Sequence, residues 1–370
     1  MNLSSVYNKS ILCSRKLENI DIFPSRNIVA LPQMKESLLK ERLYRRLFNP
    51  DYFIAVNPRL DRKNKNYVVR YLKHNKVDLI HAHFGPSGIE ILPIAAKLKI
   101  PMLVSFHGFD GSNLLKYRKY LSNLNKLFSY AFVIFPSEYM RRKVVAYVST
   151  QLKSSVIHYG IPLSQFNFIN RLSVKGKLNS NQDIILLQVS NFVEKKGHIF
   201  TIKAFEKFQK SYPNSKLILA GEGKLKNKIV EIVREMKLNE KIIFPGRIDH
   251  LEVSNLMGKA DIFLHHSVVA SNGDEEGIPN VIMEAMATGL PVISTNHAGI
   301  PELITNGING FLVNEKDIDM YVLALEKAMS LDDQIGVKAR KNIEQNFNLD
   351  IQNQRIEEVY NDVLNNKLLN

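Results

Sequence analysis

The 370-residue chain is long enough for two domains of ordinary size, and its composition, 45% hydrophobic and 23% charged, is typical of a soluble globular protein. No apolar run approaches the ~20 residues of a membrane span, and the first ten residues lack the pattern of a signal peptide, so we expect neither. The single cysteine, Cys13, excludes an intrachain disulfide and a cysteine-based zinc site, and it favours a reducing cytoplasmic compartment.

The net charge of +14 is unevenly distributed along the chain. Residues 1–165 hold 26 Lys and Arg but 10 Asp and Glu, a net charge of +16, whereas residues 166–370 have a net charge of −2. This asymmetry predicts an anionic partner for the N-terminal part: nucleic acid, an anionic membrane surface or a polyanionic acceptor. A lysine-rich, solvated surface is the plainer alternative.

The first 50 residues contain three predicted elements. Short strands are predicted at Ser10–Cys13 and Ile28–Leu31, and an amphipathic basic helix at Lys35–Phe48. Such a helix can lie on an anionic bilayer or pack its leucines on a sheet. We favour packing, with the basic rim of the helix still free to face lipid.

From Asn66 the pattern becomes α/β, because apolar strands that end in polar loops alternate with helices. This alternation predicts a parallel sheet with a site at its carboxyl edge. The predicted strands are 77–80, 102–105 and 132–135, and the predicted helices are 67–73, 89–98, 114–130 and one that starts near Ser137.

A linker rich in Asn, Ser and Lys is predicted at residues 166–182, after which the α/β pattern restarts. We therefore predict an N-terminal domain at 1–165, a C-terminal domain at 183–348, and a helical tail at 349–370 that crosses back to the first domain. The cleft between two such doubly wound domains is the natural ligand site. In the second domain the predicted strands are 184–189, 217–220, 241–244 and 261–264, and the predicted helices are 198–210, 225–236, 252–258 and the region from 317 to 369.

The stretch Gly273–Glu302 is the most informative part of the chain. An acidic loop, Asp274–Glu276, leads through a glycine into a helix with Pro279 near its first position, where a missing N–H is tolerated. That helix ends at Gly289, and a short strand follows before a second proline-led helix start at Pro301. A helix N-terminus behind a glycine offers free N–H groups and a positive dipole end, which suits a diphosphate.

Seven residues separate Glu276 from Glu284, and Ala-Met-Ala-x-Gly-x-Pro-Val follows the second. This arrangement resembles the donor-site signature of the retaining glycosyltransferases of family 4, which have the two-domain GT-B fold. The resemblance is strong over 184–313, moderate over 77–165 and weak before Val77, and GIPNVIMEAMATGLPVIST with the later GIPE is similar to enzymes of bacterial exopolysaccharide, capsule or lipopolysaccharide synthesis. A coincidental spacing on an ordinary amphipathic helix is the alternative.

The resemblance implies roles for the matching residues. Glu284 would bind the ribose hydroxyls, since a carboxylate accepts two hydrogen bonds from a vicinal diol. Glu276 would contact the donor sugar near the reacting face, and Lys196 would neutralise the leaving diphosphate. An acidic turn that merely complements the helix dipole is the alternative for the glutamates. Backbone N–H groups would reach the diphosphate from Gly277, Ile278 and Asn280.

One residue departs from the family pattern. Family members usually have an arginine five residues before the lysine, where this chain has Asn191. Lys195 or Arg247 would have to compensate for the missing phosphate contact. The loop containing Gly221 and Gly223 occupies the nucleotide-facing position of the family, although a tight turn without ligand contact also explains it.

His107, in the sequence His-Gly-Phe-Asp after a predicted strand, matches the family histidine that positions the sugar or the acceptor. His81 and His83 would flank the adjacent strand end and face the acceptor. They do not form a convincing zinc pair, because no third ligand lies at a suitable spacing. The resemblance implies that no metal and no cofactor besides the nucleotide sugar substrate is required.

The segment before Ser10 lacks the first strand and the glycine-rich loop with which family members usually begin. A displaced gene start, a natural truncation and a rebuilt N-terminal sheet all remain open. The acceptor side is therefore less defined by the sequence than the donor side.

The sequence thus predicts a cytoplasmic retaining hexosyltransferase, peripheral on the inner face of the membrane, that uses a UDP- or GDP-sugar and a lipid-linked polysaccharide precursor. The basic N-terminal half would attract anionic lipid. A weakly active or inactive assembly subunit and a sugar-nucleotide epimerase on the same fold are the alternatives. A nucleic-acid partner is disfavoured because no recognition motif accompanies the charge, and the sequence leaves the oligomeric state open.

Overall fold

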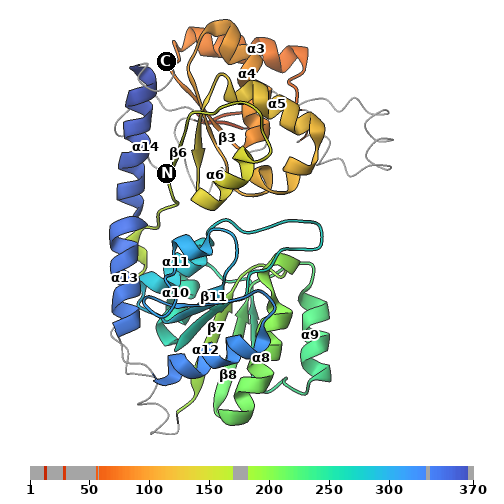
Figure 1. Cartoon of the computed structure of the whole chain (residues 1–370), viewed down its shortest axis with the longest axis vertical. Helices are drawn as coiled ribbons and strands as arrows, with labels where there is room; N and C mark the ends of the chain where they lie inside the picture. The colour runs from red at the N-terminus through yellow and green to blue at the C-terminus, as the bar shows by residue number, and fades with distance from the viewer. Residues whose placement is uncertain are drawn as a thin grey trace. The chain divides into compact units, whose positions relative to one another are not determined.

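The computed structural model describes residues 12–14, 28–30, 56, 58–169, 182–330 and 334–365. The chain divides into two compact units (Figure 1). Unit 1 comprises Met1–Phe135, Val144–Ser155 and Asn353–Asn370, and unit 2 comprises Pro136–Lys143 and Val156–Gln352.

This division differs from the domain boundary drawn at residue 165. Residues after Val156 group with unit 2 because Ile161 exchanges backbone hydrogen bonds with Phe347 and Leu349, at 3.0 and 3.1 Å. Most of the linker predicted at 166–182 and the whole helix predicted at 35–48 lie outside the described residues. The segment before Ser10, for which a missing strand and glycine-rich loop are predicted, lies outside them as well.

Unit 1 is built on a sheet with the strand order β3-β4-β5-β6, in which β3, β4 and β5 run parallel. Its central strands are buried along their whole length and are apolar except for Ser105, as expected for strands covered on both faces. The strands of this sheet are β3 (Ile80–His83), β4 (Met102–Ser105), β5 (Phe132–Phe135) and β6 (Ser154–Val156). The helices of the unit include α3 (Arg62–His74), α4 (Gly85–Leu98) and α5 (Arg118–Phe128). A separate two-stranded parallel sheet pairs β1 (Leu12–Ser14) with β2 (Ile28–Ala30).

The strand predicted at 77–80 was placed too early. The structure has β3 at Ile80–His83, in register with β4 so that Ile80 lies opposite Met102 and His83 opposite Ser105. A polar imidazole is tolerated within the strand because both ring nitrogens of His81 have partners, Tyr360 Oη at 2.5 Å and Ser105 Oγ at 2.7 Å. His81 and His83 therefore belong to the strand rather than to the loop after it.

Unit 2 is built on a six-stranded parallel sheet with the order β12-β11-β10-β7-β8-β9. The chain runs from β7 outward to β9 and then returns to place β10 on the other side of β7. This reversal makes the carboxyl ends of β7 and β10 the topological switch point, where doubly wound sheets bind ligands. The strands are β7 (Ile184–Val189), β8 (Ser215–Ala220), β9 (Ile242–Gly246), β10 (Ile262–His265), β11 (Val292–Thr295) and β12 (Phe311–Val313).

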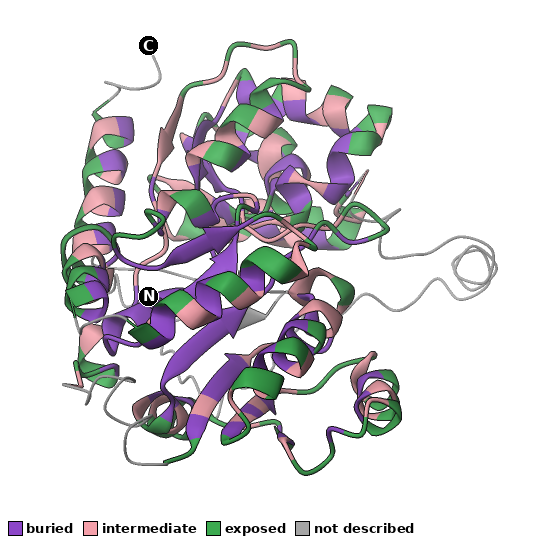
Figure 2. Ribbon diagram, turned by 60° about the horizontal axis from the view of Figure 1, so that its bottom comes forward, coloured by how far each residue is buried: buried purple, intermediate pink, exposed green. Residues whose placement is uncertain are grey.

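Helices cover both faces of this sheet and enclose two apolar cores. Figure 2 shows the strands of the sheet almost wholly buried and the helices exposed on their outer sides. Fully burying one large apolar side chain contributes roughly 1.5–3 kcal/mol. One core includes Phe205 and Phe208 of α8 (His198–Ser211), Val233 of α9 (Lys226–Glu235) and Leu325 of α12 (Ile318–Ser330); the other includes Met257 of α10 (His250–Lys259), Met283 and Met286 of α11 (Asn280–Ala287) and Ile343 of α13 (Gln334–Asn346).

In the part of the chain that the structure describes, the helical region predicted from 317 onward contains three helices, α12, α13 and α14 (Leu349–Leu364). The break between α13 and α14 lies where Phe347 and Leu349 bond to Ile161. The division into units falls within α14, so that its residues from Asn353 onward belong to unit 1. Within the described ranges, no helix is both long and apolar enough to cross a lipid bilayer.

Candidate active site

The candidate site lies at the switch point of unit 2. Lys195 and Lys196 belong to η5 (Glu194–Lys196), a short 3₁₀ turn that follows β7, and the acidic loop follows β10. Gly273 begins the loop with a φ of +79°, a conformation that favours glycine. Strand order therefore places these lysines beside carboxylates that follow them by about eighty residues.

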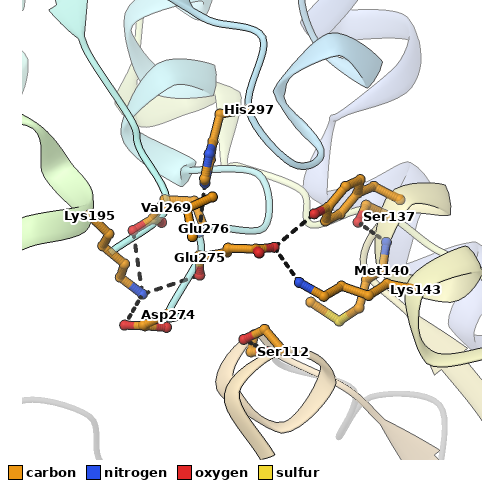
Figure 3. A network of polar contacts seen from close by, with 12 residues as sticks. Ser112, Ser137, Met140, Lys143, Lys195, Val269, Asp274, Glu275, Glu276 and His297 are labelled. Atoms are coloured by element: carbon orange, nitrogen blue, oxygen red, sulfur yellow. Dashed lines mark hydrogen bonds and ion pairs between the residues drawn. The ribbon is translucent and has the colours of Figure 1, made fainter. Parts of the chain in front are cut away.

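Two carboxylates and two amines form a compact charged cluster there. Lys196 Nζ lies 3.0 Å from Glu276 Oε1, and Lys195 Nζ lies 3.5 Å from the same oxygen and 3.1 Å from Asp274 Oδ2. Figure 3 shows Lys195 beside Asp274, with Glu276 close by. The predicted catalytic pair, Glu276 and Lys196, is thus brought into direct contact.

Burial by itself would raise the pKa of Glu276, yet Lys196 and Lys195 outweigh it and lower the pKa below its usual value. Burial likewise disfavours the charged form of Lys195, but Glu276 and Asp274 raise its pKa. Glu276 is therefore a carboxylate, and Lys195 an ammonium, at neutral pH.

His297 holds the backbone of Glu276, a role that the sequence did not reveal. The Glu276 N–H donates to His297 Nε2 at 3.1 Å, while His297 Nδ1 lies 2.6 Å from Glu315 Oε1. A nitrogen that accepts on one side must carry its proton on the other, so Nδ1–H donates to Glu315. The signal in the sequence was the polar Thr-Asn-His run at the end of β11, at the same sheet edge.

Glu284, predicted to bind ribose, lies in the second turn of α11. Burial raises the pKa of its half-buried carboxyl group, with His250 opposing the shift. None of the residues that the structure describes donates a hydrogen bond to this carboxylate or forms an ion pair with it. Its hydrogen-bonding capacity is open to a ligand.

The glycines and amides predicted to bind the nucleotide fall into two groups. A side chain at Gly277 would meet no atom within 4 Å, so the protein itself does not require a glycine there. Within the described part of the chain, no group accepts from the N–H of Gly277, Ile278 or Asn280. These three amides can therefore reach an anion at the start of α11.

Gly221 and Gly223 have packing reasons of their own. Both have positive φ, and an added Cβ would lie 2.1 Å from Ser190 O at Gly221 and 2.6 Å from Phe192 O at Gly223. Close passage of the chain against the loop after β7 accounts for both glycines. Ligand contact by this loop stays a prediction.

Arg247 lies near this glycine loop, because the N–H of Gly221 donates to Gly246 O at 2.8 Å. Its side chain is exposed and makes no ion pair with any residue in the described ranges. Asn191, at the position where an arginine was expected, is also exposed. Arg247 is thus an unengaged cation at the carboxyl edge of the sheet.

His107 lies in unit 1, apart in the chain from the residues above. Its Nε2 is 2.9 Å from His83 Nδ1, and the buried carboxylate of Asp110 accepts the N–H groups of Gly85, His107 and Gly108. Burial, with His83 adding to it, lowers the pKa of His107 to about 4, so the ring is neutral at pH 7. Asp110 therefore holds the loop that carries a neutral, hydrogen-bonding imidazole.

Exposed aromatic rings surround this imidazole. The Phe84 ring lies 4.6 Å from the His107 ring and 5.6 Å from that of Phe109, and both phenylalanines are exposed. His83 and His81 stack behind them. Across the described ranges, no group of three or more His, Cys, Asp or Glu side chains is arranged to hold a metal ion.

Two family models match the chain. The model described as Glycosyltransferase Family 4 matches residues 26–165, and the model described as Glycosyl transferases group 1 matches residues 170–348. Together they span both units.

Curated relatives of the chain are also named as glycosyltransferases. The putative colanic acid biosynthesis glycosyltransferase WcaL of Salmonella typhimurium is 29% identical over 278 residues, 73% of this chain and 67% of the relative. The amylovoran biosynthesis glycosyltransferase AmsK of Erwinia amylovora is 29% identical over 289 residues, 76% and 69% of the two chains. An Escherichia coli UDP-Gal:alpha-D-GlcNAc-diphosphoundecaprenol alpha-1,3-galactosyltransferase is 26% identical over 324 residues, 83% and 81%.

Solved structures share the fold. A glycosyltransferase from Rickettsia africae matches with a TM-score of 0.73 at 20% identity, over 96% of this chain and 90% of that one. HepE of Anabaena, solved with UDP and glucose, matches with a TM-score of 0.68 at 19% identity, over 90% and 85% of the two chains. With two parallel-sheet units and these matches along its length, the chain belongs to the family 4 glycosyltransferases and has the GT-B fold.

Proposed function

We propose that this glycosyltransferase moves a hexose from a UDP- or GDP-sugar to a lipid-linked precursor of a surface polysaccharide, with retention of configuration at the anomeric carbon. One observation carries the donor assignment: the Lys196–Glu276 pair lies beside Gly277, whose surroundings are open, and eight residues before Glu284, whose carboxylate has no partner among the described residues. A nucleotide sugar needs a diphosphate site between a ribose site and a sugar site, and this stretch offers those three in order.

In the proposed reaction, Glu284 accepts hydrogen bonds from the ribose hydroxyls, and the free amides with Lys196 bind the diphosphate. The bond from the anomeric carbon to the diphosphate oxygen breaks while the acceptor hydroxyl oxygen bonds to the same face of that carbon. The hydroxyl proton passes to the leaving diphosphate, and the nucleoside diphosphate departs. Lys195 and Arg247 add positive charge, so we propose that no metal ion is needed.

Glu276 orients the sugar in this scheme, and the neutral imidazole of His107 contacts the sugar or the acceptor. The exposed rings of Phe84 and Phe109 suit the apolar face of a sugar ring. HepE was solved with UDP and glucose, and the E. coli galactosyltransferase is named for a UDP-sugar donor and a sugar on a lipid diphosphate. Both support the proposed classes of donor and acceptor, and WcaL and AmsK support exopolysaccharide as the product.

The donor assignment predicts a nucleotide-dependent stabilisation that requires Glu284. A thermal-shift panel of UDP, GDP and their hexose conjugates should reveal one stabilising nucleotide, because a ligand at 100 times its Kd stabilises by about 2.7 kcal/mol. In Glu284→Ala we expect that shift to disappear. Glu231→Ala is the matched control, since Glu231 is an exposed carboxylate on α9 of the same unit.

An unchanged shift in Glu284→Ala would contradict the donor site. A wild-type chain that binds none of the nucleotides and transfers no sugar would instead support an inactive assembly subunit. Interconversion of free sugar nucleotides without transfer would support the epimerase.

The acceptor proposal places the enzyme at the cytoplasmic face of a membrane, reached through the basic surface of unit 1. Helix α3 contributes exposed cations and contains no acidic residue. Each cation near an anionic leaflet contributes about 1 kcal/mol of attraction. The exposed cations of α3 are Arg62, Lys63, Lys65, Arg70 and Lys73.

Vesicle sedimentation checks this surface. We expect the protein to sediment with vesicles containing 30% phosphatidylglycerol and not with pure phosphatidylcholine, and to be released by 0.5 M NaCl because salt screens the charges. Reversing Lys63, Lys65 and Arg70 to Glu should abolish sedimentation. Equal binding by that triple variant would show that α3 does not face the lipid.

A further inference from the structure

The first turns of α6 (Glu138–Val145) lie against the acidic loop within unit 2. Lys143 Nζ is 2.6 Å from Glu275 Oε2, and Tyr139 Oη donates to the same oxygen at 2.8 Å. Figure 3 shows the Glu275 carboxylate turned toward Lys143. The ion pair is largely buried, since the Lys143 side chain is 22% exposed and that of Glu275 is 11% exposed.

A second contact holds the N-terminus of the same helix. The Glu302 carboxylate accepts the N–H of Glu138 at 2.9 Å and that of Tyr139 at 2.8 Å, and His158 Nε2 lies 3.0 Å from it. Burial would raise the pKa of Glu302, but the bonds from His158 and from the two amides lower it. A helix N-terminus otherwise leaves such amides unsatisfied, so Glu302 fixes α6 to the end of the Gly273–Glu302 stretch.

Glycine at position 299 permits this close approach. A Cβ there would lie 2.9 Å from Ile278 Cγ1 and 3.0 Å from Ser137 Cβ, although φ of Gly299 is an ordinary −85°. Space, and not backbone conformation, therefore requires the glycine. The expected helix after Pro301 is only the 3₁₀ turn η6 (Ile300–Glu302), whose role here is to present Glu302 to α6.

The three successive acids of the loop differ in their nearest partners, although Lys195 lies within 3.5 Å of both Asp274 and Glu276. Asp274 pairs with Lys195, Glu275 with Lys143 and Tyr139, and Glu276 with Lys196, while the Glu276 N–H is held by His297. Fixing the carboxylate of Glu275 restrains the backbone that leads directly into Glu276. The residue directly before Glu276 is thus held by a helix that lies more than 130 residues earlier.

We propose that Tyr139 and Lys143 of α6 form a clamp on the donor site, as positioning residues that set the location of the Glu276 carboxylate through Glu275. The part of this inference that concerns transfer rests on the proposed function of Glu276. Without Lys143, the buried carboxylate of Glu275 has lost its cation. An unpaired buried charge is unfavourable, so the carboxylate lowers its free energy by moving toward water. The loop then carries Glu276 with it, and a displacement of about 1 Å at a reacting group can cost about 100-fold in rate.

The test compares two charge-removing variants on one helix of the full chain. Lys143→Met should lower kcat by about 10- to 100-fold, while nucleotide affinity changes by less than about threefold because Glu284 and α11 are untouched. Arg142→Met is the matched control: Arg142 is 77% exposed, pairs with Glu138 on α6 itself, and should leave kcat unchanged. Tyr139→Phe should give a smaller loss in kcat, since the ion pair remains.

A double-mutant cycle isolates the contact. Lys143→Met combined with Glu275→Gln should lower kcat no more than Lys143→Met does, because the buried charge disappears together with its partner. Losses that multiply, or a Lys143→Met variant that behaves like Arg142→Met, would overturn the clamp.

Hydrogen exchange gives a readout that does not depend on transfer. The amides of residues 273–277 should exchange faster in Lys143→Met than in Arg142→Met, and equal exchange would overturn the clamp. If the wild type transfers no hexose, the proposed function fails, while the exchange comparison still decides the inference.

Discussion

Replacing Lys196 with Met is expected to lower kcat for hexose transfer by about 100- to 1,000-fold, the usual effect of losing one charge-stabilising group in a water-excluded site. Negative charge grows on the diphosphate as the anomeric bond breaks. Lys196 is the cation closest to Glu276 in this site, and its side chain is 15% exposed, so little solvent screens it. The KM for the donor should also rise, because the diphosphate carries negative charge before the reaction.

Lys224→Met is the matched control, since Lys224 is an exposed lysine of unit 2 outside the charged cluster. Lys195→Met should have a smaller effect than Lys196→Met, because Lys195 also pairs with Asp274. Steady-state kinetics with the nucleotide sugar found by thermal shift, and urea unfolding of each variant, check both expectations. A Lys196→Met variant within threefold of the Lys224→Met variant in kcat would contradict the assigned role.

Acid is expected to destabilise the fold well above the pH at which carboxylates are usually protonated. Burial lowers the pKa of His198 to about 3 and that of His266 to about 4, and it lowers the pKa of His265 well below its usual value. In the unfolded chain these rings titrate near pH 6.5. Stability is therefore complete above pH 6.5 and is lost as the pH falls toward about 4, because only the unfolded chain takes up protons.

At pH 5 the His198 and His266 rings each cost about 2 kcal/mol, so together they should lower the free energy of unfolding by up to about 4 kcal/mol between pH 7 and pH 5, and His265 acts in the same direction. Urea titrations at pH 7, 6 and 5 measure this change. His198→Gln should flatten the pH dependence, whereas His74→Gln, at an exposed position on α3, should not. Stability that is flat between pH 7 and pH 5 would show that the folded protein protonates these rings without cost.

The sequence predicted best those strands that are mostly apolar. Strands β4, β5 and β7 lie at the residues expected, because burial on both faces leaves a hydrophobic run in which Ser105 and Gln188 are the polar exceptions. Strand β3 was misplaced because His81 and His83 are polar, and their stability in a strand comes from partners that are distant in the chain, such as Tyr360. The helix expected at Pro301 is a single 3₁₀ turn for a similar reason. The Glu302 carboxylate of this turn accepts hydrogen bonds from the N-terminus of α6, which is distant in the chain.

The same distinction applies to the site. Glu276, Lys196 and Glu284 could be selected because each lies in a short segment with a recognisable pattern, and the structure brings the first two into contact. Tyr139 and Lys143 could not be selected in this way, because no nearby sequence pattern indicates that they contact Glu275, which is 132 residues from Lys143. Gly221 and Gly223 show the opposite case, in which a ligand-like pattern has a packing explanation as well.

The contact between His81 and Tyr360 also bears on how the polypeptide is made. These residues are 279 positions apart, and both belong to unit 1. At ribosomal rates of about 5–20 residues per second, roughly 14–56 s separate the synthesis of His81 from that of Tyr360. The unit whose translation begins first is thus the last to be completed, and the nascent enzyme acquires its full hydrogen-bonding around β3 only after the whole of unit 2 has been translated.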